Sequence, residues 1–99
     1  MSERRKTLER TLTRTLSELI PELQDPRIPI VVTVERARFN ADLSQAKVLV
    51  SALGDARELE EMETALNGAR GYLQRELARE MRSRNTPKLT FTTDPSQVL

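Results

Sequence analysis

The sequence predicts a single α+β domain, residues 1–99, whose elements follow the order α-β-β-α-α-β. Two observations support this fold class. Apolar residues recur every three or four positions in two separate stretches, which is the spacing of one face of an α-helix. Runs rich in β-branched residues lie between these stretches and after the second one, which is typical of strands. A chain of 99 residues is long enough for one hydrophobic core but not for two.

The first helix is predicted by leucines at spacings of four and three that begin at Leu8 and continue to Leu23. Pro21 lies inside this pattern. Because proline lacks a backbone donor and clashes with the preceding turn, we expect the helix to end or kink near Ile20. Two further prolines within residues 25–29 enforce an extended connection, since the residue before a proline disfavours helical geometry.

Two antiparallel strands are predicted after this connection. Residues 30–39 are rich in β-branched side chains, and their imperfect alternation of apolar and polar residues allows for a β-bulge. Residues 45–53 alternate more clearly. Residues 40–44 between them form a polar loop of the length found in β-hairpins, so the two strands should pair with each other in antiparallel orientation.

A second helical stretch and a third strand complete the predicted fold. Asp55 can cap the helix, and several glutamates follow it in the early turns, where they complement the helix dipole. Gly68 and Gly71 interrupt the apolar stripe. Each glycine costs about 1 kcal/mol relative to alanine, so we expect the helix to kink or divide there. Pro87 ends the helical region, and residues 88–93 form the last strand.

The segment Gly68-Ala69-Arg70-Gly71 at this interruption has two interpretations. In the first, it is a turn between two helices in which small residues permit close packing. In the second, it is a GxxG-type turn whose exposed backbone lets a nucleic-acid phosphate approach closely. Short glycine spacings arise easily by chance, so spacing alone favours the first interpretation.

Lysines and arginines form three candidate groups for contacts with RNA. Two groups recur at helical spacing opposite the leucines, and the third lies on the predicted hairpin. Such stripes are often only solvated helix faces. Arginine nevertheless suits phosphate, because its planar guanidinium binds two oxygens at once. The candidate residues are Lys6, Arg10 and Arg14 on the first helix, Arg36, Arg38 and Lys47 on the hairpin, and Arg70, Arg75, Arg79 and Arg82 on the last helix.

The composition excludes most catalytic and metal-binding chemistry. The chain has no histidine and no cysteine, which removes the commonest general base and the commonest ligands of zinc and iron. The sequence contains no phosphate-binding glycine loop, nucleophile elbow or paired-carboxylate motif. We therefore expect a protein that is not an enzyme and that holds neither a metal nor a cofactor.

Charge and aromatic content narrow the kind of nucleic-acid binding. The formal net charge is only +1, so binding must depend on how the basic residues are distributed. One tyrosine and two phenylalanines are too few for a platform on which several unpaired bases could stack, which favours backbone and shape recognition of structured RNA. The lack of cysteine, of a signal peptide and of a long apolar stretch predicts a cytoplasmic protein that does not enter a membrane.

The sequence resembles the bacterial ribosome-binding factor A family in several separate motifs that occur in the same order. The resemblance implies a KH-like fold of the type II order, α-β-β-α-kink-α-β, with a three-stranded mixed sheet and the helices packed on one face. It also implies that Ala69-Arg70-Gly71 forms the helix kink that replaces the GxxG turn of KH domains, with Gly68 as an additional glycine. The matching segments are Asp25-Pro26-Arg27 and residues 42–48, 65–77 and 86–91.

The same resemblance implies a function. Members of this family bind the immature small ribosomal subunit and its ribosomal RNA, assist the maturation of that RNA, matter most in the cold and are released by a GTPase of ribosome assembly. We expect this chain to act likewise, as a monomer. Two alternatives stay open: a KH-like module that binds single-stranded RNA, and a protein-interaction module in which the acidic Glu58–Glu63 face docks a basic partner.

Overall fold

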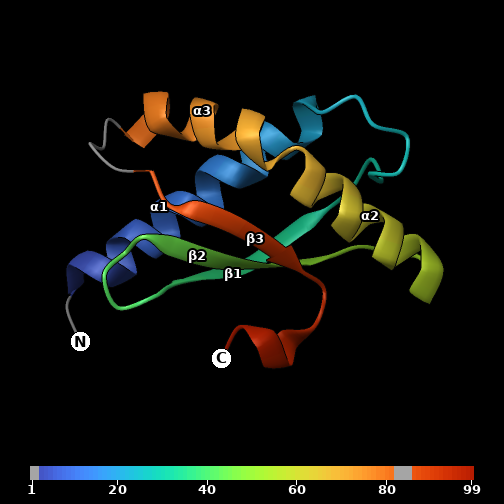
Figure 1. Ribbon diagram of the computed structural model, residues 1–99. Coiled ribbons are helices and arrows are strands. Elements are labelled where there is room, and N and C mark those ends of the chain that lie inside the picture. The colour runs from blue at the N-terminus through green and yellow to red at the C-terminus, as the bar shows by residue number, and fades with distance from the viewer. Residues whose placement is uncertain (1–2, 82–85) are drawn as a thin grey trace.

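Three α-helices cover one face of a three-stranded mixed sheet in the computed structural model, which describes residues 3–81 and 86–99 (Figure 1). This arrangement confirms the predicted α+β class, the order of the elements and the position of the helices on a single face. The elements are α1 (Glu3–Leu19), η1 (Ile20–Glu22), β1 (Thr33–Phe39), β2 (Gln45–Ser51), α2 (Ala56–Gly68), α3 (Arg70–Met81), β3 (Lys88–Thr92) and η2 (Pro95–Gln97), where η denotes a 3₁₀-helical turn.

The sheet has β2 at its centre. β1 and β2 form the predicted antiparallel hairpin, and β3 pairs with β2 in parallel orientation. The predicted bulge lies between Val34 and Arg36, where the register of β1 against β2 shifts. In the hairpin loop, Leu43 adopts a positive φ of 64°. The strand order leaves β1 at one edge of the sheet, so its outer backbone groups need partners from elsewhere.

Both hairpin strands are shorter than the sequence predicts. β1 begins at Thr33 rather than at Ile30, and β2 ends at Ser51 rather than at Leu53. Thr33 pairs with Ser51, so the two differences occur at the same end of the hairpin. The reason is that the chain leaves the sheet after β2 to start α2 at the cap residue Asp55, and the residues before β1 then have no strand to pair with.

The hydrophobic core lies between the sheet and the three helices. The inward face of β2 presents Ala46, Val48 and Val50, as the alternation of the strand predicts, and none of them is more than 1% exposed. The helices contribute the predicted leucine stripes, and the burial of these side chains holds the helices on the sheet. The buried helix leucines are Leu12, Leu16, Leu19, Leu66, Leu73 and Leu77.

The helix boundaries follow the predicted local signals. α1 ends at Leu19, and Pro21 lies in the 3₁₀ turn that follows. α2 begins with a capping box. In it, the Asp55 carboxylate accepts a hydrogen bond from the Glu58 N–H at 2.8 Å, and the Glu58 carboxylate accepts one from the Asp55 N–H at 2.9 Å. These two bonds satisfy backbone donors that the first turn of a helix otherwise leaves unpaired.

The C-terminal turn covers part of the sheet face that the helices leave open. η2 lies on the far side of the sheet from the helices and contacts β2 (Figure 1). Val98, which follows η2, is buried, and so is Leu49 on the outward-facing side of β2. The sequence does not predict this cover, because Leu49 occupies a solvent-facing position in the alternation of the strand.

Candidate nucleic-acid interface

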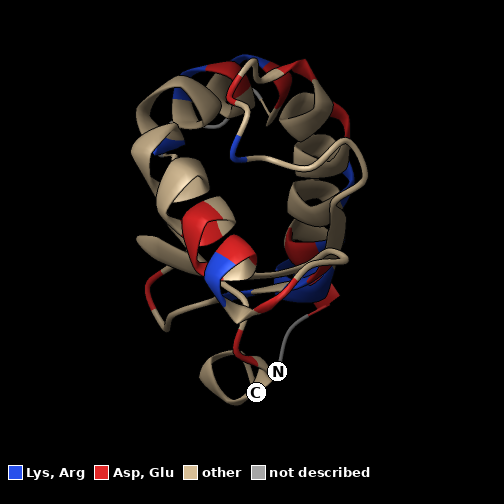
Figure 2. Ribbon diagram, turned by 90° about the vertical axis from the view of Figure 1, so that its right-hand side faces the viewer, with Lys and Arg blue, Asp and Glu red and all other residues tan. Residues whose placement is uncertain are grey.

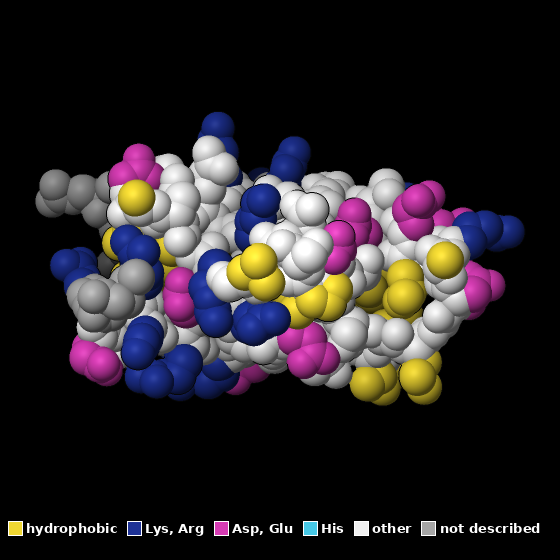
Figure 3. All heavy atoms as spheres, turned by 90° about the horizontal axis from the view of Figure 1, so that it is seen from below, with side chains coloured by type: hydrophobic (Ala, Val, Ile, Leu, Met, Phe, Trp, Pro, Cys, Tyr) yellow, Lys and Arg dark blue, Asp and Glu magenta, His cyan; other side chains and the backbone are white. Residues whose placement is uncertain are grey.

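A groove with a volume of about 760 Å³ lies between α1 and the edge strand β1. Six basic side chains line it, together with the carboxylates of Glu9 and Glu35. The structure thus brings the predicted group on the first helix together with two members of the hairpin group. Figure 3, which views the molecule from the side opposite the helices, shows Lys and Arg side chains gathered in the left and central part of this face. The basic lining residues are Arg5, Lys6, Arg10 and Arg14 from α1, and Arg36 and Arg38 from β1.

The α1 side of the groove results from the helical repeat. Lys6, Arg10 and Arg14 follow one another at intervals of four residues, so they lie along one side of α1, and all three are exposed. Leu12 and Leu16 of the same helix are fully buried in the core. Burial of these leucines therefore fixes the rotation of α1 and turns the basic stripe toward the groove.

Glu9 joins α1 to β1. One oxygen of its carboxylate accepts a hydrogen bond from the Phe39 N–H at 3.0 Å, and the other lies 3.6 Å from Nη1 of Arg38. The Phe39 N–H belongs to the edge of β1 that has no neighbouring strand, so Glu9 satisfies a donor that the sheet leaves unpaired. Glu9 is not among the residues predicted from the sequence, although its spacing of three from Leu12 and seven from Leu16 places it on the buried side of the helix.

Arg5 is a second groove residue that sequence analysis missed. Its Nη2 donates a hydrogen bond to the Ala41 carbonyl at 3.1 Å and so links the start of α1 to the hairpin loop. A stripe defined at intervals of four from Lys6 leaves Arg5 out. The consecutive basic residues Arg4, Arg5 and Lys6 are the signal that could have revealed it.

The β1 side of the groove depends on the bulge. Beyond the register shift, Arg36 lies across from Leu49 and Arg38 across from Lys47, so these residues share the sheet face opposite the helices. Nε of Arg36 is buried and has no hydrogen-bond partner within the described residues. A buried guanidinium donor without an acceptor suits an incoming anionic group such as phosphate. Lys47 is exposed and does not line the groove, but it continues the positive charge onto the outer face beside Arg38.

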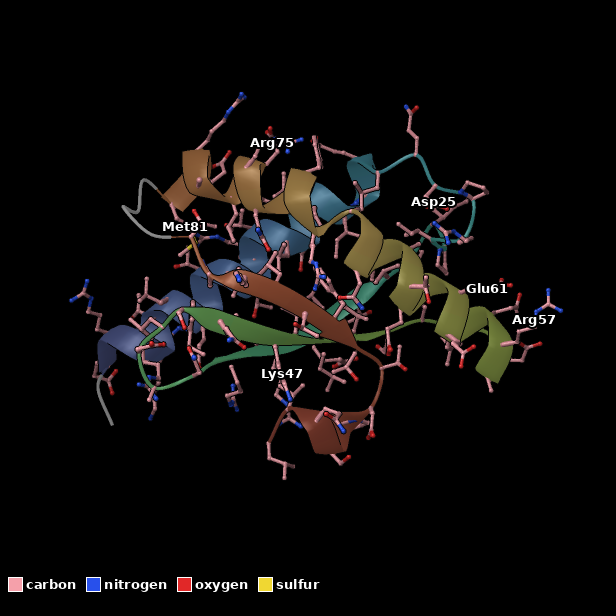
Figure 4. The ribbon with its side chains drawn as sticks, viewed as in Figure 1. Asp25, Lys47, Arg57, Glu61, Arg75 and Met81 are labelled. Carbon is pink, nitrogen blue, oxygen red and sulfur yellow. The ribbon has the colours of Figure 1, made fainter. Side chains whose placement is uncertain are left out.

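The arginines of α3 lie on a different surface. Figure 4 shows Arg75 pointing away from the sheet on the helix side, whereas Lys47 points to the opposite side. Arg79 is partly neutralised by Glu76, whose carboxylate lies 3.7 Å from its Nη1. Arg82 lies outside the described residues. The structure therefore places the predicted RNA contacts on two surfaces. One is the groove together with the neighbouring Lys47, and the other is the exposed face of α3. The exposed arginines of α3 are Arg70, Arg75 and Arg79.

The joint between α2 and α3 is at Ala69. α2 ends at Gly68, α3 begins at Arg70, and Ala69 packs against the core between them, which confirms the helix kink expected at Gly68, Ala69 and Gly71. The predicted turn between two helices is present, but close packing at the two glycines is not. Outside the adjacent backbone, a Cβ at Gly68 would meet no atom within 4 Å, and one at Gly71 would meet only Nη1 of Arg75 at 4.0 Å. Both glycines are exposed, and contact of this backbone with phosphate stays a prediction.

The Asp25-Pro26-Arg27 segment is held by a local ion pair. The Asp25 carboxylate accepts hydrogen bonds from Nη2 of Arg27 at 2.8 Å, from its Nε at 3.1 Å and from its backbone N–H at 2.9 Å. These bonds, together with the charge of the guanidinium, lower the pKa of Asp25 to about 2. The pKa of Arg27 is raised by the same bonds to Asp25 and, to a smaller extent, by the charge of Glu61 on α2. The segment therefore lies beside α2.

Neither a metal site nor a membrane-spanning helix is found in the described part of the chain. Within residues 3–81 and 86–99, no three side chains of His, Cys, Asp or Glu are grouped so that they could hold a metal ion. The helices that the structure describes are too short or too polar to cross a membrane.

Comparison with known proteins identifies the family. The family model described as ribosome-binding factor A matches residues 4–98. The chain belongs to the ribosome-binding factor A family. It is 39% identical over 98 residues to the family member from Pelobacter propionicus, with 98% of this chain and 80% of that protein covered. It is 46% identical over 74 residues to the member from Anaeromyxobacter sp. (strain K), with 75% of this chain covered, and it spans about half (54%) of the length of that relative.

Solved structures named for ribosome-binding factor A share the fold. A Thermotoga maritima protein solved by NMR has a TM-score of 0.85 at 32% identity, with 95% of this chain and 90% of that chain covered. The crystal structure of ribosome-binding factor A from Thermus thermophilus has a TM-score of 0.78 at 38% identity, with 89% and 93% covered. A Thermus thermophilus homology model fitted into a cryo-electron-microscopy map of a 30S complex has a TM-score of 0.69 at 34% identity, with 90% and 93% covered. These likenesses confirm the KH-like fold.

Proposed function

We propose that this chain binds structured ribosomal RNA on the immature small ribosomal subunit and so assists the maturation of that RNA. The observation that carries the proposal is the groove between α1 and β1, where six basic side chains meet. The family, and the likeness to a relative fitted into a 30S complex, support the small subunit as the partner. The choice of RNA within that subunit rests on the charge of the groove.

Phosphate groups of folded RNA fit this groove better than unpaired bases do. The cations come from two elements that Glu9 holds together, so their spacing is set before the ligand arrives and little ordering is needed on binding. Phe39 is the aromatic residue among the lining side chains, and it packs against the core. A single half-buried ring cannot stack several unpaired bases, which favours recognition of backbone and shape over single-stranded RNA.

Assistance to RNA maturation requires only differential binding. A protein that binds one conformation of an RNA more tightly than the others shifts the RNA toward that conformation and leaves when the conformation is lost. In this proposal the chain acts in the cytoplasm as a monomer and without catalysing a reaction, and a GTPase of ribosome assembly releases it. The exposed arginines of α3 would contact a second RNA segment on the opposite side of the molecule.

Charge reversal in the groove tests the proposal. In the variant Lys6→Glu/Arg10→Glu/Arg14→Glu, attraction to phosphate becomes repulsion, and we expect affinity for immature subunits to fall by roughly 100-fold or more. The three side chains are exposed, so the melting temperature should change little. Sedimentation with purified immature subunits, paired with a thermal melting curve, measures both effects.

The variant Arg75→Glu/Arg79→Glu is the matched control, because it also reverses charges at exposed helical positions four residues apart. We expect it to weaken binding by about tenfold or less, since α3 is the secondary contact. Normal binding by the groove variant, with lost binding by the α3 variant, would contradict the proposal and move the RNA surface to α3.

A further inference from the structure

Three exposed aliphatic side chains lie at the end of the hairpin that is farther from its loop. Ile30 is 96% exposed, Val31 74% and Leu53 98%, and we call these residues the aliphatic patch. Thr33 and Ser51 form the last pair of the hairpin at this end, and Val31 and Leu53 each lie two residues beyond that pair along the chain. In Figure 3 hydrophobic side chains are exposed at the right-hand end of the face opposite the helices, away from the gathered basic residues.

The fold itself imposes the exposure of the aliphatic patch. Val32 and Ala52, which lie one step closer to the paired strands, are half-buried and pack against the core. Val31 and Leu53, the next residues beyond them, do not share this packing and are exposed. Binding of a second molecule over the aliphatic patch would remove this apolar surface from water, which is favourable.

Carboxylates border the aliphatic patch on two sides. Glu58 lies at the turn after Leu53, where its carboxylate accepts a hydrogen bond from the Asp55 N–H at 2.9 Å. Glu35 lies on the other side, with its Oε2 2.5 Å from the Ser51 hydroxyl. Asp55, Glu58 and Glu35 are all exposed, so their charges face solvent beside the aliphatic side chains. Figure 2 looks onto this end of the molecule and shows the acidic residues at the near end of α2.

Two nearby arginines already have acidic partners. Arg57 pairs with Glu61 at 3.4 Å, and Arg27 pairs with Asp25 at 2.8 Å, all at the same end of the molecule (Figure 4). The charge beside the aliphatic patch is therefore acidic and repels phosphate, which disfavours an RNA ligand. A basic protein segment fits instead, because its lysines and arginines would meet the carboxylates while its aliphatic side chains cover the patch.

A pocket of about 470 Å³ lies next to the aliphatic patch on the same sheet face. Glu35, Arg36 and Ser51 line its polar side, and Leu49 and Pro95 supply apolar surface. Arg36 offsets the charge of Glu35 in this pocket, so the preference for a basic partner rests on the carboxylates beside the aliphatic patch.

We infer that the aliphatic patch, with Glu35, Asp55 and Glu58, docks a lysine- and arginine-rich segment of a protein carried by the immature small subunit. The inference rests on the proposed function for the assembly on which that protein is found, but apart from Glu35, which also lines the groove, it uses residues outside the groove. The groove binds RNA and the aliphatic patch binds protein. Two linked contacts of this kind raise the overall affinity for an assembly that presents both ligands at the right separation.

Site-directed photo-cross-linking tests the inference. The chain contains no cysteine, so one introduced cysteine can carry a benzophenone probe at a chosen site. We expect labelled Leu53→Cys, irradiated with purified immature small subunits, to cross-link to lysine- and arginine-rich peptides of a subunit protein, as identified by mass spectrometry. Ala41→Cys is the matched probe, because it is exposed at the hairpin end of the groove, and it should cross-link to RNA.

An affinity measurement gives a second test. The variant Ile30→Ser/Val31→Ser/Leu53→Ser should bind immature subunits about tenfold more weakly than the wild type and protein-free small-subunit RNA equally well. Thr64→Ser, a substitution at an exposed position of α2 outside the groove and the aliphatic patch, is the control and should change neither affinity. Cross-linking of labelled Leu53→Cys to RNA, or unchanged binding of the triple variant to both ligands, would overturn the inference. Failure of the proposed function would show differently, as a wild-type chain that does not bind protein-free RNA.

Discussion

Glu9 has a structural and an electrostatic role at the groove. Because its carboxylate accepts a hydrogen bond from the free edge of β1, it takes the place of a neighbouring strand and fixes α1 against the sheet. The same carboxylate lies 3.6 Å from Nη1 of Arg38 and sets the position of a cation that lines the groove. Removal of the Glu9 side chain would leave the Phe39 N–H without its acceptor, which would destabilise the fold. This role explains why a carboxylate lies among the basic residues of the groove.

The pKa of Asp25 is a test of the ion pair with Arg27. The hydrogen bonds lower this pKa from its ordinary 3.8 to about 2, so the folded state favours the charged carboxylate. The stability that the pair contributes is therefore present above the ordinary value and is lost as the pH falls from about 4 to about 2. We expect an NMR titration of the Asp25 carboxyl carbon to give a midpoint near 2 in the wild type and a higher midpoint, still below 3.8, in Arg27→Ala, which removes the guanidinium bonds but keeps the backbone N–H bond.

Asp42 is the internal control for this titration. Its pKa is lowered by hydrogen bonds from Ser44 rather than by Arg27, so its midpoint should be the same in both proteins. A wild-type midpoint for Asp25 close to 3.8 would contradict the geometry of the ion pair.

Two local distortions decide which surfaces the elements present. The bulge in β1 shifts its register, and a shift of one residue exchanges the faces of all residues beyond it, so Arg36 and Arg38 share the face of Lys47. The joint at Ala69 divides one helical stretch into α2, which begins with acidic residues, and α3, which exposes arginines. The sequence predicts the location of both distortions from imperfect alternation and from glycine. It does not predict the role of the glycines, because their surroundings depend on tertiary packing.

The exposed glycines at the joint should tolerate side chains. Gly68→Ala and Gly71→Ala each place a Cβ in nearly open space, and neither glycine has a positive φ. We expect each substitution to leave the free energy of unfolding unchanged or to raise it by up to about 1 kcal/mol, because alanine has the higher helix propensity. Urea unfolding followed by circular dichroism measures the change.

Gly54→Ala is the control for these two variants. A Cβ at Gly54 would lie 3.2 Å from Cβ of Glu58 in the turn before α2, so we expect this substitution to lower the free energy of unfolding. A loss of more than about 1 kcal/mol in Gly68→Ala or Gly71→Ala would show that these glycines are needed for packing after all.

The molecule separates its charges although its net charge is only +1. The basic residues gather toward one end of the sheet face that Figure 3 shows, and Asp55 and Glu58 lie beyond the other end of the hairpin, whereas Glu35 lies between them and also lines the groove. One end therefore suits phosphate and the other suits a basic protein segment. A subunit in assembly presents both kinds of surface, so this separation lets one small domain recognise an assembly rather than a single ligand.

Local spacing accounts for the part of the site that is predictable from sequence. Lys6, Arg10 and Arg14 share a side of α1 because they recur every four residues, and alternation in β2 places Lys47 on the outer face. Contacts between distant residues account for the rest. The bond from Phe39 to Glu9 joins residues 30 positions apart and holds α1 to β1 at the groove, and no periodic pattern encodes it. For the same reason, the sequence does not separate the arginines of α3 from those of the groove.

The salt dependence of RNA binding tests most directly whether the groove holds phosphate groups. Each phosphate contact contributes roughly 0.7 to 0.9 to the slope of log K against log salt concentration, because binding releases condensed counterions. We expect the wild-type slope to be several units, and the slope of Lys6→Ala/Arg10→Ala/Arg14→Ala to be smaller by about 2 to 3. A wild-type slope near zero, or a slope that these three substitutions leave unchanged, would contradict the binding of RNA backbone in the groove.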